Sequence, residues 1–566
     1  MAFIGIDLGT TNSLVAVWQN NESILIPNVH GEYLTPSVIS LNDDGQILIG
    51  KIAKERLVTH SKQTVSNFKR LMGTSEKVII SNKSFSPEEL SALVLKQLKA
   101  DAEAFLNEAV DEAVISVPAY FNDNQRNATR VAATLAGLHV ERLINEPTAA
   151  AIAYGVHEKK DEKSFIVIDL GGGTFDVSIM EKFDDLLEVH ASAGDSFLGG
   201  EDFTLMLMHH FLAKHDIELC KLTSNDHGRL YHLFDQVKCR LSDQEKVDFD
   251  IVVDGKSLPN TLIQDELYEI FSPLLKRLLK PIEQSIHDAK LDLAEIDDVF
   301  LVGGATRMKT VRQFITRLFN RFPSCHINPD HVVAMGAAIQ AALKQRNQAL
   351  KDVVLTDVCP FSLGIEVASE GPDGSVVSGI FSVIIERNTT IPASRVENFC
   401  TVKDHQVKIL IKIFQGENRL VKHNILLGEF EVAVPPKQAG LETVDIRFTY
   451  DINGLLEVIA TLVSTAKASS IVIQNSSSRL STADIEVALK KLEILKIHPR
   501  DNDVNQAILA RAERLYQERL GAVREKIGQA IMEFEHILNS QDPRAIERSA
   551  KSLEQYLNTL ERDFWI

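Results

Sequence analysis

Two short motifs place an aspartate directly before a glycine turn that carries hydroxyl side chains. The first is Asp7-Leu8-Gly9-Thr10-Thr11-Asn12-Ser13, and the second is Asp169-Leu170-Gly171-Gly172-Gly173-Thr174-Phe175-Asp176. Glycine lets backbone N–H groups approach phosphate oxygens closely, and the threonine hydroxyls add hydrogen-bond donors. An aspartate at the end of a strand can hold Mg²⁺ through water or orient an attacking water. Either motif alone fits an ordinary strand turn, but two matching copies favour a duplicated phosphate-binding clamp.

A third glycine motif, Gly303-Gly304-Ala305-Thr306-Arg307, follows the apolar run 299–302 and precedes a helical pattern. Its glycines could let a nucleotide base or ribose lie against the backbone. Taken alone it fits a helix-entry turn equally well. It gains weight because it is the third such loop within one block of about 350 residues.

The block that holds these motifs, residues 1–351, alternates β-branched runs with amphipathic stretches. Residues 113–118 and 165–169 are typical of strands, whereas residues 87–105 and 262–290 predict helices. Strands that alternate with helices indicate an α/β architecture.

From residue 358 to 480 the helical period gives way to strict alternation. Val407, Ile409, Ile411 and Ile413 would line one face of a strand, and Asn453-Gly454 fits a tight hairpin turn. The segment therefore predicts an antiparallel β domain. Between the two blocks, residues 352–357 are apolar in the middle and acidic at both ends, so we expect a linker that docks in some states.

The helical period returns at Ser481. Ile485, Ala488, Leu489, Leu492 and Leu495 recur at helical spacing, and residues 481–566 predict a helical hairpin or bundle with solvated outer faces.

The composition excludes several classes of protein. Lys and Arg number 60 against 78 Asp and Glu, and the formal net charge of −18 argues against a general nucleic-acid binder or a basic membrane-surface protein. No apolar run reaches the ~18 residues of a membrane span, and the first residues do not resemble a secretory signal. Five scattered cysteines without a CxxC pair indicate free thiols in a reducing cytosol, so we expect a cytoplasmic protein.

The order of several motifs supports a resemblance to a known family. The two aspartate motifs and the third glycine motif occur with Val117-Pro118-Ala119-Tyr120-Phe121 and Asn145-Glu146-Pro147-Thr148-Ala149-Ala150-Ala151 between them. Downstream follow Asn328-Pro329-Asp330, Ser362-Leu363-Gly364-Ile365-Glu366, Asn388-Thr389-Thr390-Ile391-Pro392 and Phe414-Gln415-Gly416-Glu417. Over nearly its whole length, the chain resembles the DnaK-type, seventy-kilodalton heat-shock chaperones. The glycine loops alone would also fit actins and sugar kinases.

The resemblance implies a multidomain protein. It implies an actin-like, two-lobed α/β ATPase over residues 1–351, a linker over 352–357, an antiparallel β-sandwich that binds peptides over 358–480, and an α-helical lid over 481–566. The implied ligands are ATP or ADP with Mg²⁺, and K⁺ is a further cation that the resemblance allows. The implied partners are extended client polypeptides and a J-domain co-chaperone. The weak basal ATPase activity would be stimulated by the co-chaperone and by bound peptide.

Two departures from the family concern its regulation. The segments 73–85 and 243–262 are short, which leaves the need for an exchange factor open. Together with Thr356 in the linker, they resemble a specialised bacterial branch, HscC-like, rather than the housekeeping member.

The resemblance also assigns roles to residues of the first block. Catalysis would involve Lys69, Glu146, Asp169 and Thr174, and a cation at Lys69 can hold the attacking water. Asp7 and Asp169 would organise the metal. The nucleotide would contact Gly9, Thr10, Thr11, Asn12, Gly171, Gly172, Gly173, Gly199, Gly200, Asp235, Lys238, Ser242, Gly303, Gly304, Arg307 and Asp330. The family prefers Glu at the position of Asp235 and often Arg at that of Cys239.

Two further sets follow from the resemblance. The peptide cleft would comprise Ile365, Val367, Ala368, Phe399, Val402, Ile409 and Ile411, where an ordinary sandwich core is the alternative for any single residue. Ala368 and Val402 suggest an altered or reversed arch over the peptide. Coupling between the domains would involve Pro118, Arg126, Val353, Val354 and Leu355.

Three functions share this ATPase fold: an ATP-driven peptide-binding chaperone, a sugar or metabolite kinase, and an actin-like filament protein. The kinase and filament hypotheses leave residues 358–566 unexplained, so we favour the chaperone. Stimulation of ATP hydrolysis by an extended apolar peptide, rather than by a sugar or by self-assembly, distinguishes them.

Overall fold

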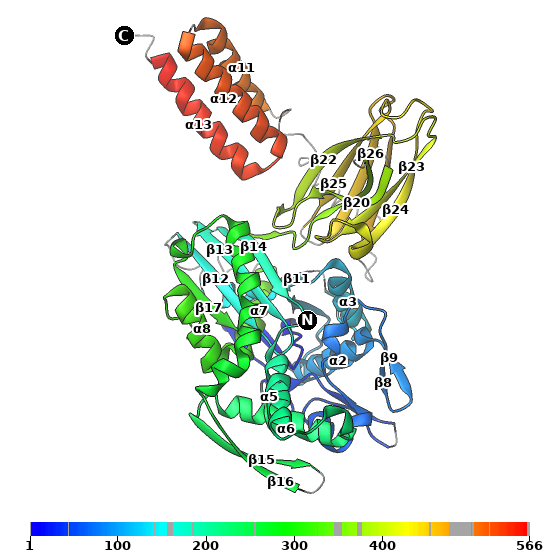
Figure 1. Ribbon diagram of the computed structural model, residues 1–566, viewed down its shortest axis with the longest axis vertical. Coiled ribbons are helices and arrows are strands. Elements are labelled where there is room, and N and C mark those ends of the chain that lie inside the picture. Colours follow the sequence, from blue (N-terminus) through cyan, green and yellow to red (C-terminus); the bar gives the residue numbers. More distant parts are fainter. Residues whose placement is uncertain are drawn as a thin grey trace.

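Figure 1 shows the computed structural model of the chain. The structure describes residues 2–43, 45–140, 142–155, 162–183, 186–253, 256–324, 326–344, 354–370, 376–451, 454–474, 500, 503–519 and 521–562. None of the helices within these ranges is long and apolar enough to cross a membrane.

The first motif lies in a mixed sheet whose strand order is β11-β10-β1-β2-β3. β1 and β2 form an antiparallel hairpin, and β10 and β11 extend the sheet in the parallel direction from β1. The turn of the β1–β2 hairpin holds the first aspartate motif. The strands are β1 (Phe3–Asp7), β2 (Asn12–Gln19), β3 (Glu22–Leu25), β10 (Glu112–Val117) and β11 (Leu143–Asn145).

The second motif lies in a second sheet built on the same plan. β12 and β13 form an antiparallel hairpin whose turn holds the second aspartate motif, and β17 lies parallel to β12. The order is β17-β12-β13-β14-β18-β21, in which β18 is Val354–Val358 and β21 is Thr390–Ile391. The strands of this block are β12 (Lys163–Leu170), β13 (Phe175–Phe183), β14 (Leu186–Asp195) and β17 (Asp298–Val302).

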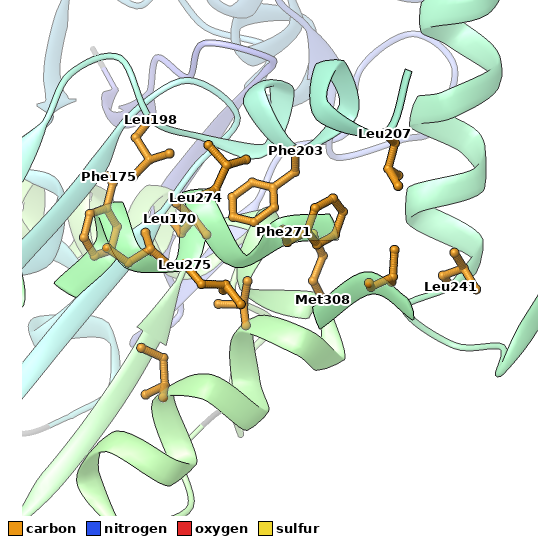
Figure 2. Close-up of a cluster of buried hydrophobic side chains, with 14 of the residues drawn as sticks. Leu170, Phe175, Leu198, Phe203, Leu207, Leu241, Phe271, Leu274, Leu275 and Met308 are labelled. Atoms are coloured by element: carbon orange, nitrogen blue, oxygen red, sulfur yellow. The ribbon is translucent and has the colours of Figure 1, made fainter. Parts of the chain in front are cut away.

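Helices surround the two sheets and position the remaining site residues. A buried cluster packs against the second hairpin, as Figure 2 shows for Leu170 and Phe175 beside Leu198, Phe203 and Phe271. The side chains of Leu170 and Phe175, both within the motif, are fully buried. The helices are α1 (Lys51–Thr59), α2 (Pro87–Leu106), α3 (Asp123–Leu135), α4 (Glu146–Ala153), α5 (Gly200–Lys214), α6 (Ser224–Arg240), α7 (Glu266–Ala289), α8 (Lys309–Phe319) and α9 (Val332–Lys344).

One sequence prediction about these helices is wrong at its start. The helix predicted from residue 262 begins at Glu266, because Lys256–Ile263 is strand β16, paired antiparallel with β15 (Lys246–Val253). Asn260 and Leu262 are buried and Thr261 is exposed, which is the two-residue period of a strand rather than a helical one.

The described strands between residues 363 and 474, apart from β21 (Thr390–Ile391), form two four-stranded antiparallel sheets that share one apolar core. In β23, Ile411 and Ile413 face that core, whereas Lys412 forms an ion pair with Glu366 at 3.0 Å. The first sheet contains β19 (Leu363–Glu370), β20 (Val376–Ile385), β23 (Lys408–Gln415) and β24 (Ile425–Ala433). The second contains β22 (Ala393–Cys400), β25 (Thr443–Tyr450), β26 (Leu455–Leu462) and β27 (Ala468–Gln474). Of the predicted hairpin turn, Gly454 has φ of 80°, and Asn453 lies outside the described residues.

A strand connects the two blocks. β18 (Val354–Val358) pairs in parallel with β14, with Leu355 opposite Leu187, and antiparallel with β21 (Thr390–Ile391). The linker segment therefore forms a strand that extends the second sheet and joins it to the β domain. Val353 lies outside the described residues.

Among the residues that the structure describes after 500, three helices with their own core form the C-terminal bundle, at the top of Figure 1. They are α11 (Asp503–Glu518), α12 (Gly521–Ser540) and α13 (Pro543–Arg562). The helix predicted over Ile485, Ala488, Leu489, Leu492 and Leu495 lies outside the described residues.

Candidate functional site

The turns of both hairpins border one cavity of about 1160 Å³. Residues far apart in the sequence line it, including nearly all of the predicted nucleotide contacts. These are Asp7, Gly9, Thr10, Thr11, Asn12, Lys69, Glu146, Asp169, Gly171, Gly172, Thr174, Gly200, Asp235, Lys238, Ser242, Gly303, Gly304, Arg307 and Asp330.

The two aspartate motifs approach each other directly across this cavity. A Cβ on Gly172 would lie 1.8 Å from Thr11 Oγ1, so only glycine fits there. Ser37 braces the first turn by donating to the Gly9 carbonyl oxygen at 2.8 Å, and its Oγ lies 2.9 Å from that of Ser13. Within the described residues, the buried Thr11 Oγ1 has no hydrogen-bond partner. A cradle of backbone and an unsatisfied hydroxyl suits the oxygens of a phosphate group.

A buried ion pair lies at the wall of the cavity. Lys69 Nζ is 3.1 Å from Glu146 Oε1, and both side chains are less than 10% exposed. Lys69 comes from a short 3-10 helix, Phe68–Leu71, and its ammonium lies 5.5 Å from the centre of the Phe121 ring. Glu146 is the first residue of α4. The pair leaves further donor capacity on the ammonium, which can face the cavity.

Carboxylates crowd the same end of the cavity. Burial, followed by the negative charge of Glu146, raises the pKa of Asp7 to about 7, although Lys69 and a 3.0 Å hydrogen bond from Ser116 oppose the shift. The same two causes raise the pKa of Asp169 well above its ordinary value and that of Asp176 to about 7. These raised pKa values mean that the buried carboxylates lack enough positive charge nearby. A bound divalent cation would supply it.

The residues present fit Mg²⁺ held with help from other oxygens. Among the described residues, no group of three or more His, Cys, Asp or Glu side chains is arranged to hold a metal ion alone. Mg²⁺ keeps several waters and is usually bound through one or two carboxylates together with substrate phosphates. Asp7 and Asp169 suit that arrangement.

At the other end of the cavity, Lys238 is the centre of a polar cluster. Its ammonium donates to Thr204 Oγ1 at 2.7 Å, to Asp235 Oδ1 at 2.8 Å and to the Gly200 carbonyl oxygen at 2.9 Å. Burial opposes ionisation of Asp235, but the Lys238 ammonium prevails and lowers the pKa of that carboxyl. The Asp235 carboxylate is therefore committed to Lys238.

The third glycine motif lies beside this cluster. Arg307 donates to Asp330 Oδ2 at 2.8 Å and to Asn328 Oδ1 at 2.6 Å. A Cβ on Gly304 would lie 2.5 Å from Asp330 Oδ1. The flat backbone at Gly303 and Gly304 thus forms part of the cavity wall, as expected for a surface against which a ring can lie.

Two predicted residues border the cavity lining without belonging to it. The Gly173 carbonyl oxygen accepts a hydrogen bond from Arg70 Nε at 3.0 Å, and the Gly199 N–H donates to Asp202 Oδ2 at 2.8 Å. Arg70 also forms an ion pair with Asp202 at 2.6 Å. Both glycines therefore help to join the 3-10 helix at Lys69 to the second hairpin and α5.

Sequence reasoning missed this bridge. Near Arg70, Asn67 donates to Glu201, so two residues on either side of Lys69 contact α5. Burial raises the pKa of Glu201 to about 7, although Arg70 opposes the shift. The partners lie more than 130 residues apart in the sequence, and no local pattern marks them.

The predicted peptide-binding residues divide by burial. Ile365 and Ile411 belong to the core shared by the two sheets. Val367, Phe399 and Ile409 are partly buried at its margin, Ala368 is partly buried, and Val402 is 44% exposed. The alternative of a sandwich core thus describes Ile365 and Ile411, whereas the other five residues are accessible.

The predicted coupling residues lie between the cavity and the linker strand. Arg126 donates to the carbonyl oxygens of Phe121 and Ala119 and, at 2.7 Å, to Asn145 Oδ1. Asn145 in turn donates to Asp357 Oδ2 of β18 at 2.5 Å. Pro118 is buried directly after β10 and precedes Ala119, whose carbonyl oxygen accepts from Arg126. Leu355 packs against the cluster around β12 and α9.

Comparison with protein families agrees with this geometry. A family model described as Hsp70 protein matches residues 3–82 and 75–565. The match includes both aspartate motifs, the β domain and the C-terminal helices. The chain therefore belongs to the Hsp70 family, whose members are ATP-hydrolysing chaperones that bind ATP and ADP with Mg²⁺.

Proposed function

We propose that ATP binding and hydrolysis in the cavity control the capture and release of extended apolar polypeptides by the β domain. The observation that carries this proposal is the linker strand. β18 pairs with β14 of the nucleotide-cavity block on one side and with β21 of the β domain on the other. A state of the first block that changes the edge of its sheet thus acts directly on the second block.

The chemistry proposed for the cavity is transfer of the γ-phosphoryl group of ATP to water. Bound Mg²⁺ would neutralise charge on the phosphate oxygens. The turns at Thr10–Asn12 and Gly171–Thr174 present donors to those oxygens. Lys69, fixed by Glu146 at 3.1 Å, holds the attacking water and offsets the negative charge that develops in the transition state. The carboxylates of Asp7 and Asp169 would hold the metal together with its waters.

The adenosine end is proposed at the Lys238 cluster. Asp235, Lys238 and Ser242 would contact the ribose and base, and Gly303 and Gly304 would give the ring a flat surface. Arg307, which Asp330 and Asn328 hold in place, closes this end.

We assign the peptide cleft to the accessible margin of the β domain. Val367, Phe399 and Ile409 would contact apolar side chains, and Ala368 and Val402 would form the arch above the peptide backbone. Ile365 and Ile411 would support this cleft from the core beneath it. Backbone hydrogen bonds would bind an extended client and apolar contacts would select it.

Contacts between the blocks support a docked state that ATP would favour. Asp123 at the start of α3 accepts a hydrogen bond from Tyr450 at 2.9 Å, and its N–H donates to Gln415 at 3.0 Å. On α7, Asp288 accepts two hydrogen bonds from Arg387, at 2.8 and 3.0 Å. A paired fork of this kind is among the stronger ionic contacts and fixes orientation.

The remaining assignments complete the proposal. Residues 1–351 would form the ATPase domain, 352–357 the linker, 358–480 the peptide-binding domain and 481–566 the lid. A J-domain co-chaperone would stimulate hydrolysis in the cytoplasm, and the short segments 73–85 and 243–262 bear on the contribution of an exchange factor.

The experiment measures peptide affinity and release with ATP and with ADP, alone and with candidate J-domain proteins. We expect ATP to speed release of an extended apolar peptide and that peptide to stimulate hydrolysis. Nucleotide-independent peptide binding, or hydrolysis that responds to a sugar or to self-assembly instead, would contradict the proposal.

A further inference from the structure

Arg544, in the first turn of α13, makes contacts outside the helix bundle. Its guanidinium nitrogens donate to Glu188 and, at 3.1 Å, to Thr390 Oγ1, and lie 3.0 Å from His190 Nδ1. Glu188 and His190 belong to β14, and Thr390 belongs to β21. One side chain of the bundle therefore contacts both the nucleotide-cavity block and the β domain.

The linker strand lies between these two contacts. β18 separates β14 from β21 in the sheet, with Thr356 opposite Glu188 and Val358 opposite Thr390. Arg544 thus spans the linker strand β18 and connects β14 and β21, the two strands with which β18 is paired. A guanidinium suits this position because its donors form a rigid fork that reaches several acceptors at once.

A second contact fixes the same end of the bundle. Gln541, in the turn between α12 and α13, accepts from the Val396 N–H at 3.3 Å and donates to the Val396 carbonyl oxygen at 3.1 Å. Beside it, a cavity of about 580 Å³ lined by Glu397, Asn398 and Arg447 adjoins Asn539 and Gln541. The cavity is polar in its lining, so the turn docks by directed hydrogen bonds rather than by an apolar interface.

We propose that Arg544 is a positioning residue that couples the orientation of the helix bundle to docking of the linker. With the α12–α13 turn in place, Arg544 holds β14 and β21 together over β18. When the bundle moves away, the linker strand loses this support and leaves the sheet more readily. The inference rests on the proposed function, because linker docking is the step that ATP would control there.

His190 completes the acceptor set for Arg544. Its Nε2 lies 2.8 Å from Glu181 Oε2 on the neighbouring strand β13. With its proton on Nε2, the neutral ring leaves Nδ1 free to accept from Arg544. Burial, followed by the charge of Arg544, lowers the pKa of His190, against the opposite effect of Glu181 and Glu188.

The test is hydrogen exchange of the β18 amides in the full chain, without nucleotide or peptide. In Arg544→Ala we expect exchange about tenfold faster, which corresponds to ~1.4 kcal/mol. Arg548→Ala, an exposed arginine one turn along α13, is the matched control and should not change exchange. Glu188→Gln should act like Arg544→Ala, and combining the two changes should add little.

Two outcomes would overturn the inference. One is unchanged β18 exchange in both Arg544→Ala and Glu188→Gln, and the other is full additivity of their effects. Protection of the buried Ile531 and Phe534 amides in α12 reports whether the bundle still folds, and Glu188→Gln leaves the bundle sequence intact. Because no nucleotide is present, the readout stands even if the proposed ATP-driven function fails.

Discussion

Asn145 donates a hydrogen bond of 2.5 Å to Asp357 of the linker strand. The next residue in the chain, Glu146, is the ion-pair partner of Lys69 in the cavity. One peptide unit therefore separates the cavity wall from the linker contact. A shift of Glu146 that accompanies a change at Lys69 must displace Asn145, and with it the bond to Asp357.

This relationship predicts the effect of Asn145→Ala. Burial raises the pKa of Asp357, and the Asn145 amide and the Arg126 charge stabilise its carboxylate. Hydrogen bonds to charged groups contribute about 1.5–3 kcal/mol. We expect the acceleration of peptide release by ATP to fall about tenfold or more. Stopped-flow release of a fluorescent peptide measures it.

A nearby asparagine provides the control for this change. Asn124, on the exposed side of α3, should tolerate Asn124→Ala without effect on release. Equal effects of the two variants would show that the Asn145–Asp357 bond carries no signal.

Lys69→Ala should leave ATP binding largely intact and nearly abolish hydrolysis. Loss of one preorganised electrostatic contact to the transition state typically costs ~10²–10³ in rate. Single-turnover hydrolysis measures the chemical step, and equilibrium binding measures affinity. Lys62→Ala, at an exposed lysine of the same region, is the control. A Lys69→Ala rate close to wild type would remove Lys69 from the mechanism.

Ile409→Phe should weaken peptide binding, because added volume would fill the proposed central pocket. Overpacking a tight site costs about 1–3 kcal/mol. Leu410→Phe is the matched control, since Leu410 is the next residue of β23 and points to the opposite, exposed side. Fluorescence anisotropy with a labelled peptide gives both affinities. A folded Ile409→Phe variant with unchanged affinity would assign Ile409 to the core.

The sequence sufficed for those features that local residue types determine. The second aspartate motif requires glycine at position 172, where a Cβ would lie 1.8 Å from Thr11 Oγ1 of the first motif, so residue types and their order located the cavity. Contacts between residues far apart in the sequence show no such local pattern. Arg70 and Asp202 are both ordinary surface residue types, and only folding brings them within 2.6 Å.

Strand assignments that depend on a partner were equally beyond local patterns. Residues 354–358 become a strand because β14 offers a free edge, which no property of the linker itself reveals. Leu258 and Leu262 fit the spacing of a helix as well as that of a strand, and pairing with β15 decides between them. Within the β domain, alternation placed Ile411 on one face of its strand but did not show whether that face meets a core or a ligand.

Val354→Asp combined with Leu355→Asp should uncouple the two blocks. Leu355 packs against the cluster around β12 and α9, and burying an apolar side chain fully contributes ~1.5–3 kcal/mol, less when burial is partial. Charges in this strand would prevent its docking on β14. We expect peptide to lose its stimulation of hydrolysis and ATP to lose its acceleration of release.

Thr356, the residue after Leu355, provides a control in which the substitution makes the linker strand more apolar rather than charged. Thr356 Oγ1 is buried without a hydrogen-bond partner among the described residues. Thr356→Val replaces it by an apolar group of the same shape and should preserve or strengthen docking. If ATP still accelerates release to the wild-type extent in the double aspartate variant, the signal crosses through another interface.

The contact between Arg544 and His190 should depend on pH. Burial of the ring and the Arg544 charge lower the pKa of His190 in the docked state, whereas an undocked histidine titrates near ~6.5. The undocked state therefore binds the proton more readily, so docking is strongest above pH ~6.5 and weakens as the pH falls below it. Protonation also removes the Nδ1 acceptor and places a cation beside Arg544. Exchange of the β18 amides, corrected for its intrinsic pH dependence, should thus accelerate at low pH. His190→Asn supplies an acceptor that does not titrate there, and it should abolish the extra acceleration; a variant with the wild-type profile would assign the titration to another group.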